Sequence, residues 1–513
     1  MEALNTAVSM RGITKHFDLK KANTNVDFDL NKGEIVSLLG ENGSGKTTLM
    51  NMLAGIYYPD KGQIFVDGKE VSINSPKEAY ELGIGMVHQH FKLVDVFTAA
   101  ENIVLGEENT KYDLNAAKQK IKDICDRYGF VVDPDKKIYN MTVSEKQTVE
   151  IVKVIYRGAK ILILDEPTAV LTPQETEQLF KVMRNMKADG KAIIIITHKL
   201  NEVMAISDRV VILRRGEYVG QLLTKDTNPQ EMTDMMVGHA VTLNIERPEP
   251  VNPKEKIRIK NLTVTDEEGV KKVDNVSFYM NSNEILGIAG ISGSGQKELL
   301  EAIAGIQKVD SGSVIYIDDD GKEHELIGMR PNEIRDLGVA LSFVPEDRLG
   351  MGLVGNMNIS ENMMLRTFGT SHKLFTDREK PRKVAKKVVE QLDVSTPGLD
   401  TPVRRLSGGN VQKILVGREI SQRPEVFLTA YAVRGLDINS SYKIYDLINQ
   451  QKKDGVAVLF VGEDLDVLMQ LSDKIMVLCD GQVSDIVDAK KTNKNEIGLL
   501  MTSLSGEREN HEQ

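Results

Sequence analysis

The stretch Gly40-Glu-Asn-Gly-Ser-Gly45-Lys46-Thr47 follows the apolar run Glu34–Leu39 and precedes residues with helical spacing. Its glycines let successive backbone N–H groups turn inward around phosphate oxygens, and the start of a helix adds positive potential. The Lys46 ammonium is then placed to reach the β and γ phosphates of a nucleotide, and the Thr47 hydroxyl to bind Mg²⁺. The alternative is a glycine-rich turn that only closes a strand. The strand before the motif and the helix after it favour the phosphate-binding loop.

A second apolar run, Ile161–Leu164, ends in Asp165 and Glu166. Because the carboxyl ends of parallel strands meet at one edge of a sheet, Asp165 is expected beside the phosphate-binding loop, where it can hold Mg²⁺. Glu166 can polarise an attacking water molecule. An apolar strand that ends in Asp-Glu most often only meets solvent. Paired with the loop, it indicates a nucleotide site.

The 513-residue chain contains this unit twice. The segment Gly33–Gly45 reappears as Asn283–Gly295, shifted by 250 residues, and Ser207–Arg209 reappears as Ser472–Lys474, shifted by 265. Repeats at such a large and nearly constant shift indicate duplication of a whole domain rather than a solenoid.

We therefore expect an α/β fold of two tandem nucleotide-binding domains, each with a parallel-sheet core, an added antiparallel β portion and a helical subdomain. Three prolines in Glu246–Pro253 predict a short, stiff linker, because proline does not continue a helix or a central strand. The expected boundaries are 1–241 for the first domain, 242–256 for the linker, 257–504 for the second domain and 505–513 for a polar tail.

Composition excludes several other classes of protein. Hydrophobic residues make up 41% and charged residues 27%, as in globular proteins. The aliphatic runs are far shorter than the roughly 20 residues that cross a bilayer, and no secretory signal is expected at the N-terminus. Two cysteines form neither a disulfide framework nor a four-cysteine zinc site. A net charge of -10 argues against a phosphate backbone as the main partner.

Together these motifs resemble those of the ATP-binding-cassette (ABC) ATPases, over nearly the whole chain. The resemblance identifies Gln89 as the glutamine that this family carries at a strand end, and Leu406-Ser-Gly-Gly-Asn410 as its signature sequence. It also makes His198 the switch histidine, although a histidine after a strand is by itself more often a surface residue. Phe17 occupies the position of an aromatic residue that packs against adenine. Taken alone, Leu406–Gly409 would be an ordinary helix N-cap.

The resemblance implies ATP and Mg²⁺ as cofactors and distributes the roles among residues. The expected catalytic residues are Glu166, His198 and Gln89. The expected metal ligands are Thr47, Gln89 and Asp165. The residues expected to bind the nucleotide are Phe17, Gly40, Glu41, Asn42, Gly43, Ser44, Gly45, Lys46, Thr47, Thr48, Ser407, Gly408, Gly409 and Asp437.

The two copies differ in opposite ways. In this family two cassettes pack head to tail, so each ATP lies between the loop of one cassette and the signature of the other. The second copy keeps its signature and Asp437, but its other motif residues are replaced: Gln296 for Lys46, Lys297 for Thr47, Ala430 for Asp165, Tyr431 for Glu166, Glu346 for Gln89 and Glu463 for His198. The first copy has Met141–Glu145 as its signature and Thr172 in place of Asp437. This pattern predicts one catalytic and one non-catalytic site.

Tandem cassettes with such one-sided losses resemble the ATPase subunits of sugar and nucleoside importers. Gly85–Val94 and Val344–Arg348 are similar to the nucleoside-type branch, which works with basic-membrane-protein-type binding lipoproteins, although Tyr431-Ala432 departs from its usual Gln-Pro. The resemblance implies two transmembrane permease subunits and an extracellular substrate-binding lipoprotein. It places the chain at the cytoplasmic face of the cell membrane, held there by the permease, with no nucleic acid and no direct contact with the cargo.

Two alternatives stay open. The same role in a sugar importer is the first. A soluble tandem ABC ATPase that acts on ribosomes or DNA is the second, but such proteins have a long charged linker or zinc-binding cysteine clusters, and this sequence has neither.

Overall fold

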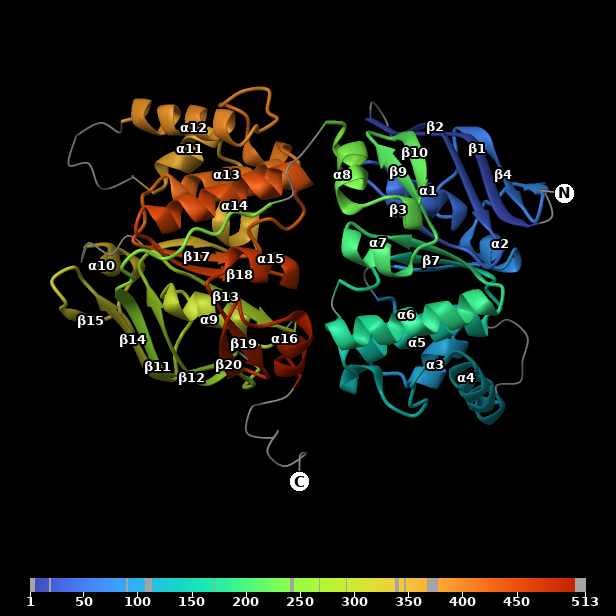
Figure 1. The fold of residues 1–513 in the computed structure, drawn as a ribbon, viewed down its shortest axis with the longest axis horizontal. Helices are drawn as coiled ribbons and strands as arrows, with labels where there is room; N and C mark the ends of the chain where they lie inside the picture. The colour runs from blue at the N-terminus through green and yellow to red at the C-terminus, as the bar shows by residue number, and fades with distance from the viewer. Residues whose placement is uncertain are drawn as a thin grey trace. The chain divides into compact units, whose positions relative to one another are not determined.

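The computed structural model describes residues 5–17, 20–88, 91–106, 113–169, 171–239, 244–266, 268–291, 293–336, 341–345, 347–366 and 377–502. The chain divides into two compact units, Met1–Thr242 and Leu243–Gln513. Each unit contains a four-stranded antiparallel sheet, a six-stranded sheet that is mostly parallel, and helices packed on these sheets (Figure 1). The α/β fold expected from the sequence is confirmed.

The antiparallel sheet of the first unit has the strand order β2-β1-β4-β5. Its strands are β1 (Thr6–Phe17), β2 (Lys20–Asn31), β4 (Lys61–Val66) and β5 (Lys69–Val71). The six-stranded sheet has the order β10-β9-β3-β8-β7-β6, in which only β10 runs antiparallel to its neighbour. Its strands are β3 (Ile35–Leu39), β6 (Ile84–Val87), β7 (Ile161–Asp165), β8 (Ala192–Ile196), β9 (Arg209–Arg214) and β10 (Glu217–Leu223).

Helices cover both faces of the six-stranded sheet, and their ends carry the expected stop and start signals. Thr172 caps α6 and Pro173 occupies its first turn, while Gly129 ends α4 in the left-handed conformation. Helices α3 and α4 pack against α5, at one end of the first unit in Figure 1. The helices of this unit are α1 (Lys46–Leu53), α2 (Pro76–Glu81), α3 (Ala99–Val104), α4 (Leu114–Tyr128), α5 (Val143–Tyr156), α6 (Pro173–Ala188), α7 (Leu200–Ile206) and α8 (Pro229–Val237).

The core of the first unit lies on both sides of the six-stranded sheet. Because side chains alternate along a strand, Ile161 and Ile163 of β7 join the cluster under the antiparallel sheet, whereas Leu162 and Leu164 join the cluster under α3–α6. Two-sided burial explains why these central strands are continuously apolar. Ala99, Ala100 and Ile103 are also fully buried, so they belong to the core and do not line a surface groove.

The second unit repeats this topology. Its antiparallel sheet has the order β12-β11-β14-β15 and its six-stranded sheet the order β16-β17-β18-β13-β19-β20, in which β20 is the antiparallel edge strand. The strands are β11 (Glu255–Thr265), β12 (Lys271–Asn281), β13 (Ile285–Gly290), β14 (Ser311–Ile317), β15 (Glu323–Glu325), β16 (Leu341–Val344), β17 (Val426–Ala430), β18 (Ala457–Val461), β19 (Lys474–Cys479) and β20 (Gln482–Asp488). Strand for strand, β16-β17-β18-β13-β19-β20 matches β6-β7-β8-β3-β9-β10.

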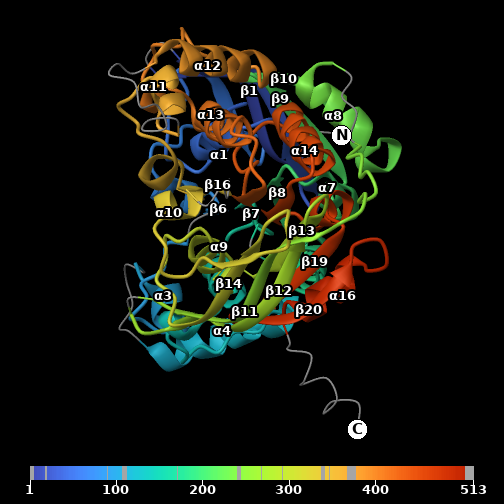
Figure 2. The ribbon, with the colours of Figure 1, turned by 90° about the vertical axis from the view of Figure 1, so that its left-hand side faces the viewer.

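The helices of the second unit also follow those of the first. Helices α11 and α12 pack together and α12 lies on α13, as Figure 2 shows from the side. The helices are α9 (Gln296–Ile303), α10 (Pro331–Asp336), α11 (Ile359–Met364), α12 (Glu379–Gln391), α13 (Gly408–Ile420), α14 (Ile438–Lys453), α15 (Leu465–Leu471) and α16 (Lys494–Leu500).

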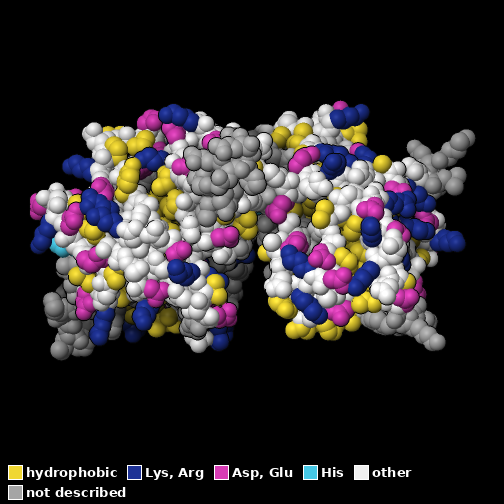
Figure 3. Space-filling view, turned by 90° about the horizontal axis from the view of Figure 1, so that it is seen from below, with side chains coloured by type: hydrophobic (Ala, Val, Ile, Leu, Met, Phe, Trp, Pro, Cys, Tyr) yellow, Lys and Arg dark blue, Asp and Glu magenta, His cyan; other side chains and the backbone are white. Residues whose placement is uncertain are grey.

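The surface carries both signs of charge. Figure 3 shows acidic and basic side chains interspersed on each unit, over the face that it draws. Within the described ranges, every helix is too short or too polar to cross a membrane.

Candidate functional site

The phosphate-binding loop of the first unit connects β3 to α1, as the sequence predicts. Gly45 caps α1 in the left-handed conformation, with φ 93° and ψ 5°. A Cβ atom on Gly45 would lie 2.3 Å from the Ala22 carbonyl oxygen of β2, so only glycine fits. The amide of Asn23, which is fully buried, donates to the Gly45 carbonyl over 3.3 Å. The antiparallel sheet therefore supports the loop from behind.

Lys46 is held inside this loop. Its ammonium nitrogen donates to the carbonyl oxygens of Gly40 (2.7 Å) and Glu41 (3.0 Å), and the side chain is buried. Burial lowers the pKa of Lys46, and the negative charges of Glu166 and Asp165 oppose that effect. An ammonium group carries three N–H donors, so the same nitrogen can also donate to a phosphate oxygen.

Asp165 and Thr47 meet at the edge of the sheet. The Thr47 hydroxyl donates a hydrogen bond to the Asp165 carboxylate. Burial, together with the neighbouring charge of Glu166, nevertheless raises the pKa of Asp165 to about 6. A hydroxyl and a carboxylate oxygen side by side are the hard oxygen ligands that Mg²⁺ prefers, and a dication would relieve the buried negative charge. The residues present therefore fit the metal.

Glu166 follows directly and faces the end of β8. Its backbone N–H donates to the Ile196 carbonyl (2.8 Å), and its φ of 47° turns the chain sharply after the strand. The Glu166 Oε1 and His198 Nδ1 atoms are 3.0 Å apart. This hydrogen bond lowers the pKa of Glu166, so its carboxylate stays ionised in the neutral range and can accept a proton or hydrogen bond.

The structure thus brings Lys46, Thr47, Asp165, Glu166 and His198 together, from the ends of three neighbouring strands. Gln89 lies outside the described residues.

Phe17, at the end of β1, packs edge-to-face on Tyr57 with ring centroids 5.1 Å apart, and its ring is 39% exposed. It offers an accessible aromatic surface, as a residue that stacks on adenine must. Asn23 is the supporting residue that sequence reasoning missed, because a single asparagine within a strand carries no recognisable signal.

The corresponding loop of the second unit keeps its backbone and loses its charge. Gly295 caps α9 with the same angles as Gly45, φ 93° and ψ 5°. Gln296 replaces the lysine, and its buried amide donates to the Ile291 carbonyl over 3.0 Å. A neutral amide therefore occupies the place of the ammonium.

The strand ends of the second unit likewise keep the backbone conformation of the first unit but carry different side chains. Tyr431 has a φ of 53° and donates its backbone N–H to the Val461 carbonyl (3.0 Å), as Glu166 does to Ile196. The position before it is the buried Ala430. Glu463, at the histidine position, pairs with Arg434 over 3.3 Å.

Each signature segment supplies a helix N-cap, and so do Asp437 and its counterpart Thr172. Ser407 accepts from the Asn410 N–H (3.4 Å) at the start of α13, and Asp437 accepts from the Ser440 N–H (2.8 Å) at the start of α14. Thr142 and Thr172 cap α5 and α6 of the first unit with full capping boxes. The helix N-cap that the sequence suggested for Leu406–Gly409 is therefore present, and the three other positions are N-caps as well.

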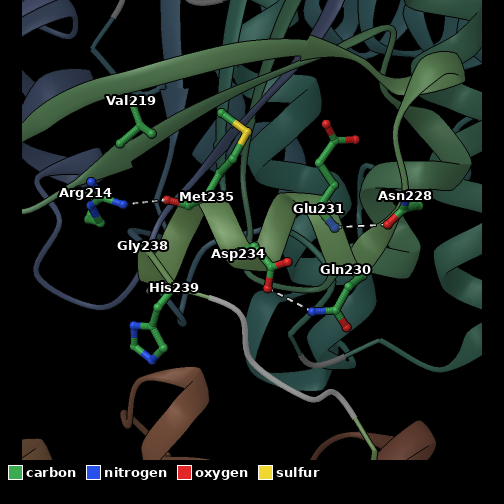
Figure 4. A pocket seen from close by; sticks show the side chains of 9 residues that line it. All are labelled: Arg214, Val219, Asn228, Gln230, Glu231, Asp234, Met235, Gly238 and His239. Atoms are coloured by element: carbon green, nitrogen blue, oxygen red, sulfur yellow. Dashed lines mark hydrogen bonds between the residues drawn. The ribbon is translucent and has the colours of Figure 1, made fainter.

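A separate hollow of about 570 Å³ lies beside α8 in the first unit (Figure 4). Its polar lining is engaged locally: Arg214 donates to the Met235 carbonyl, and Gln230 to the Asp234 carboxylate. None of the residues expected to bind nucleotide lines it. The described residues also contain no cluster of three or more histidine, cysteine or acidic side chains that could hold a metal ion.

The comparisons with known proteins agree with the duplicated motifs. The family model for ABC transporters matches residues 23–169 and 273–429. The nucleoside import ATP-binding protein NupA of Lactococcus lactis subsp. cremoris is 43% identical over 97% of this chain and 98% of its own length. The guanosine import ATP-binding protein NupO of Bacillus subtilis is 42% identical over 96% and 97%. The ribose import ATP-binding protein RbsA 1 of Rubrobacter xylanophilus is 35% identical over 97% and 98%.

A solved structure with two such units has the same fold. The complex of the archaeal ribosomal stalk protein aP1 and the ribosome recycling factor aABCE1 matches with a TM-score of 0.60 over 95% of this chain and 90% of that chain. At 16% identity, this match supports the fold alone.

Proposed function

The chain belongs to the ABC transporter ATPases, and on that premise we propose that it energises a nucleoside importer, with purine nucleosides as the first candidates. The observation that carries the proposal is the full-length similarity to NupA and NupO, at 43% and 42% identity, against 35% for the ribose relative. A sugar importer is the competing assignment, and the experiment below separates the two.

In this proposal the first unit carries the catalytic machinery. Lys46 donates to the β and γ phosphates of ATP, and Thr47 and Asp165 hold Mg²⁺ together with Gln89. When bound, the metal offsets the negative charge on the phosphate oxygens. Glu166 accepts a hydrogen bond from the attacking water and orients it, and His198 keeps that carboxylate ionised and in place through the 3.0 Å contact.

Hydrolysis of this ATP also uses the signature and Asp437 of the second unit. The reason is the distribution of losses: the first unit keeps every phosphate, metal and water residue but has Val143 and Ser144 where the second has Gly408 and Gly409. Ser407, Gly408 and Gly409 then bind the γ phosphate through the N-terminus of α13. Together the two units supply one complete set of these residues.

The remaining pair of motifs forms a site that does not hydrolyse ATP. Gln296, Ala430 and Tyr431 offer no ammonium, no metal-binding carboxylate and no acid to orient water. The Glu145 carboxylate stands where the second signature has Asn410, and it is held by Lys136 at 2.7 Å. A carboxylate offers a nucleotide phosphate no hydrogen-bond donor.

In this proposal the chain lies at the cytoplasmic face of the membrane, held there by two permease subunits. An extracellular binding lipoprotein then selects the cargo, which this chain does not touch. ATP binding and hydrolysis then make the permease alternate its access.

The test measures uptake of labelled guanosine and labelled ribose in cells that lack the gene. The cells are complemented with the wild-type chain, with Glu166→Gln, or with Tyr431→Phe as the matched change at the equivalent strand end. We expect wild type and Tyr431→Phe to restore guanosine uptake and Glu166→Gln to fail.

Ribose uptake in place of guanosine uptake would reassign the cargo and keep the mechanism. Equal uptake with Glu166→Gln would contradict the catalytic assignment. Uptake of neither compound would contradict both importer assignments.

A further inference from the structure

Arg348 bridges two segments of the second unit that are far apart in sequence. It lies in the single π-helical turn Arg348–Gly352, after β16. Its Nη1 atom donates to the Gly408 carbonyl over 3.0 Å, and its Nη2 atom donates to the Arg434 carbonyl. Gly408 opens α13 within the signature, and Arg434 belongs to the loop between β17 and α14 that ends at Asp437.

Two glycines border this guanidinium group. A Cβ atom on Gly408 would lie 3.2 Å from Nη1, and one on Gly435 would lie 3.4 Å from Nη2. The first unit has Val143 and Val170 at the matching positions in sequence. It also has no arginine in residues 88–98, between β6 and α3. The arginine and both glycines are therefore present together in one unit and absent together from the other.

The turn that carries Arg348 is itself firmly anchored. The Asp347 carboxylate accepts from the Leu349 N–H (3.2 Å) and the Gly350 N–H (2.8 Å). The Gly352 carbonyl accepts from Arg418 of α13 over 2.7 Å. Arg418 is buried and pairs with the fully buried Glu419. The turn is thus fixed to α13 at its far end, independently of Arg348.

We propose that Arg348 is a positioning residue that locks the signature and the Asp437 loop into one block and thereby sets the rate of ATP hydrolysis in the first unit. This rests on the proposed function, in which Ser407–Gly409 and Asp437 take part in hydrolysis of the ATP that Lys46 binds. A planar guanidinium group can donate to two carbonyl oxygens at a fixed angle, which a lysine ammonium does with less geometric constraint. Without it, Ser407 and Asp437 still cap their helices but no longer keep a fixed separation.

The experiment uses the full chain and compares Arg348→Ala and Arg348→Lys with wild type. We expect Arg348→Ala to lower kcat for phosphate release by about 10- to 100-fold, because small misplacements of orienting groups have effects of that size. The Kd of ATP, measured with a fluorescent analogue, should change less than about threefold, since Lys46 and its loop are untouched. Arg348→Lys should restore part of the lost kcat, because it replaces one of the two hydrogen bonds.

Arg382→Ala is the matched control. Arg382 pairs with Asp400 on the exposed surface of the same unit over 3.0 Å, so its loss should leave kcat unchanged. An unfolding temperature for each variant separates loss of fold from loss of position. If kcat falls only as much as the folded fraction, and Arg348→Lys restores neither, Arg348 has a structural role and the proposal is wrong. Unchanged kcat in Arg348→Ala would also overturn the proposal.

A Ser407→Ala variant distinguishes this failure from failure of the proposed function. If Ser407→Ala lowers kcat and Arg348→Ala does not, the positioning role is wrong and the proposed role of the signature stands. If neither variant changes kcat, the signature of the second unit does not serve the catalytic site, and both proposals fall.

Discussion

The loops after β3 and β13 have the same backbone and different chemistry. Both end in a glycine with φ 93° and ψ 5°, and both lead into an eight-residue helix. One presents the Lys46 ammonium, and the other presents the Gln296 amide turned onto the Ile291 carbonyl. The glycines and the strand-to-helix connection therefore decide the shape, and a few side chains decide whether that shape can act on a phosphate.

The largest effect should come from exchanging the side chains that differ most. Lys46→Ala is expected to lower ATP turnover by about 10²- to 10³-fold, the usual loss when one donor to a developing charge is removed. Gln296→Ala, at the same point of the second loop, should change turnover less than about threefold, because that side chain only closes its own loop. Phosphate release at saturating ATP measures both variants. Comparable losses of turnover in the two variants would show that the two loops are functionally equivalent and would contradict the assignment of catalysis to the first.

Much of this contrast could be predicted from the sequence, because its signals are local. The glycine pattern, the apolar strand before it and the acid at the end of β7 lie within short windows, and the duplication aligned the replacements position by position. What could not be predicted are contacts between distant segments. The contact of Asn23 with the loop and the bridge from Arg348 to Gly408 depend on how strands and helices pack. In the sequence, Val344–Arg348 showed only a similarity to the nucleoside-type branch and did not reveal this bridge.

The second comparison concerns Asp165 and the alanine that replaces it at 430. Burial raises the pKa of Asp165 from 3.8 to about 6, so the folded protein holds this proton more tightly than the unfolded chain does. Between those two pKa values the folded state therefore binds more protons, and stability falls as the pH rises. Above about pH 6 the ionised carboxylate lowers the free energy of unfolding by roughly 1–3 kcal/mol in the protein without nucleotide.

Asp165→Asn should remove that destabilisation. It should also lower Mg²⁺-dependent turnover by about 100-fold or more. Thermal unfolding without nucleotide should show the variant more stable than wild type at about pH 7.5 and equal to it near about pH 4. Asp135→Asn, at an exposed carboxylate that pairs with Lys118, is the control and should match wild type at both values. If the Asp165→Asn protein were less stable than wild type at neutral pH, the ionised Asp165 carboxylate would not destabilise the fold. The alanine at 430 would then reflect something other than relief from a buried charge.

The smallest effect tests the two signatures, where structure and function are hardest to separate. Thr142 and Ser407 are both N-caps, so Thr142→Ala and Ser407→Ala should each lower stability by about 1 kcal/mol. Turnover should separate them: Ser407→Ala is expected to lower it about tenfold, because we propose that the same hydroxyl also binds the γ phosphate. Thr142→Ala should leave it within about twofold.

The unfolding temperature and the turnover of Thr142→Ala and Ser407→Ala must both be measured. If Ser407→Ala lowers turnover only in proportion to its folded fraction, the hydroxyl is a cap and nothing more. If the two variants lose the same stability but only Ser407→Ala loses turnover, the two N-caps stabilise their helices alike and differ in function. The segment Met141–Glu145 then has a structural role, because Thr142 and Glu145 form a complete capping box at the start of α5.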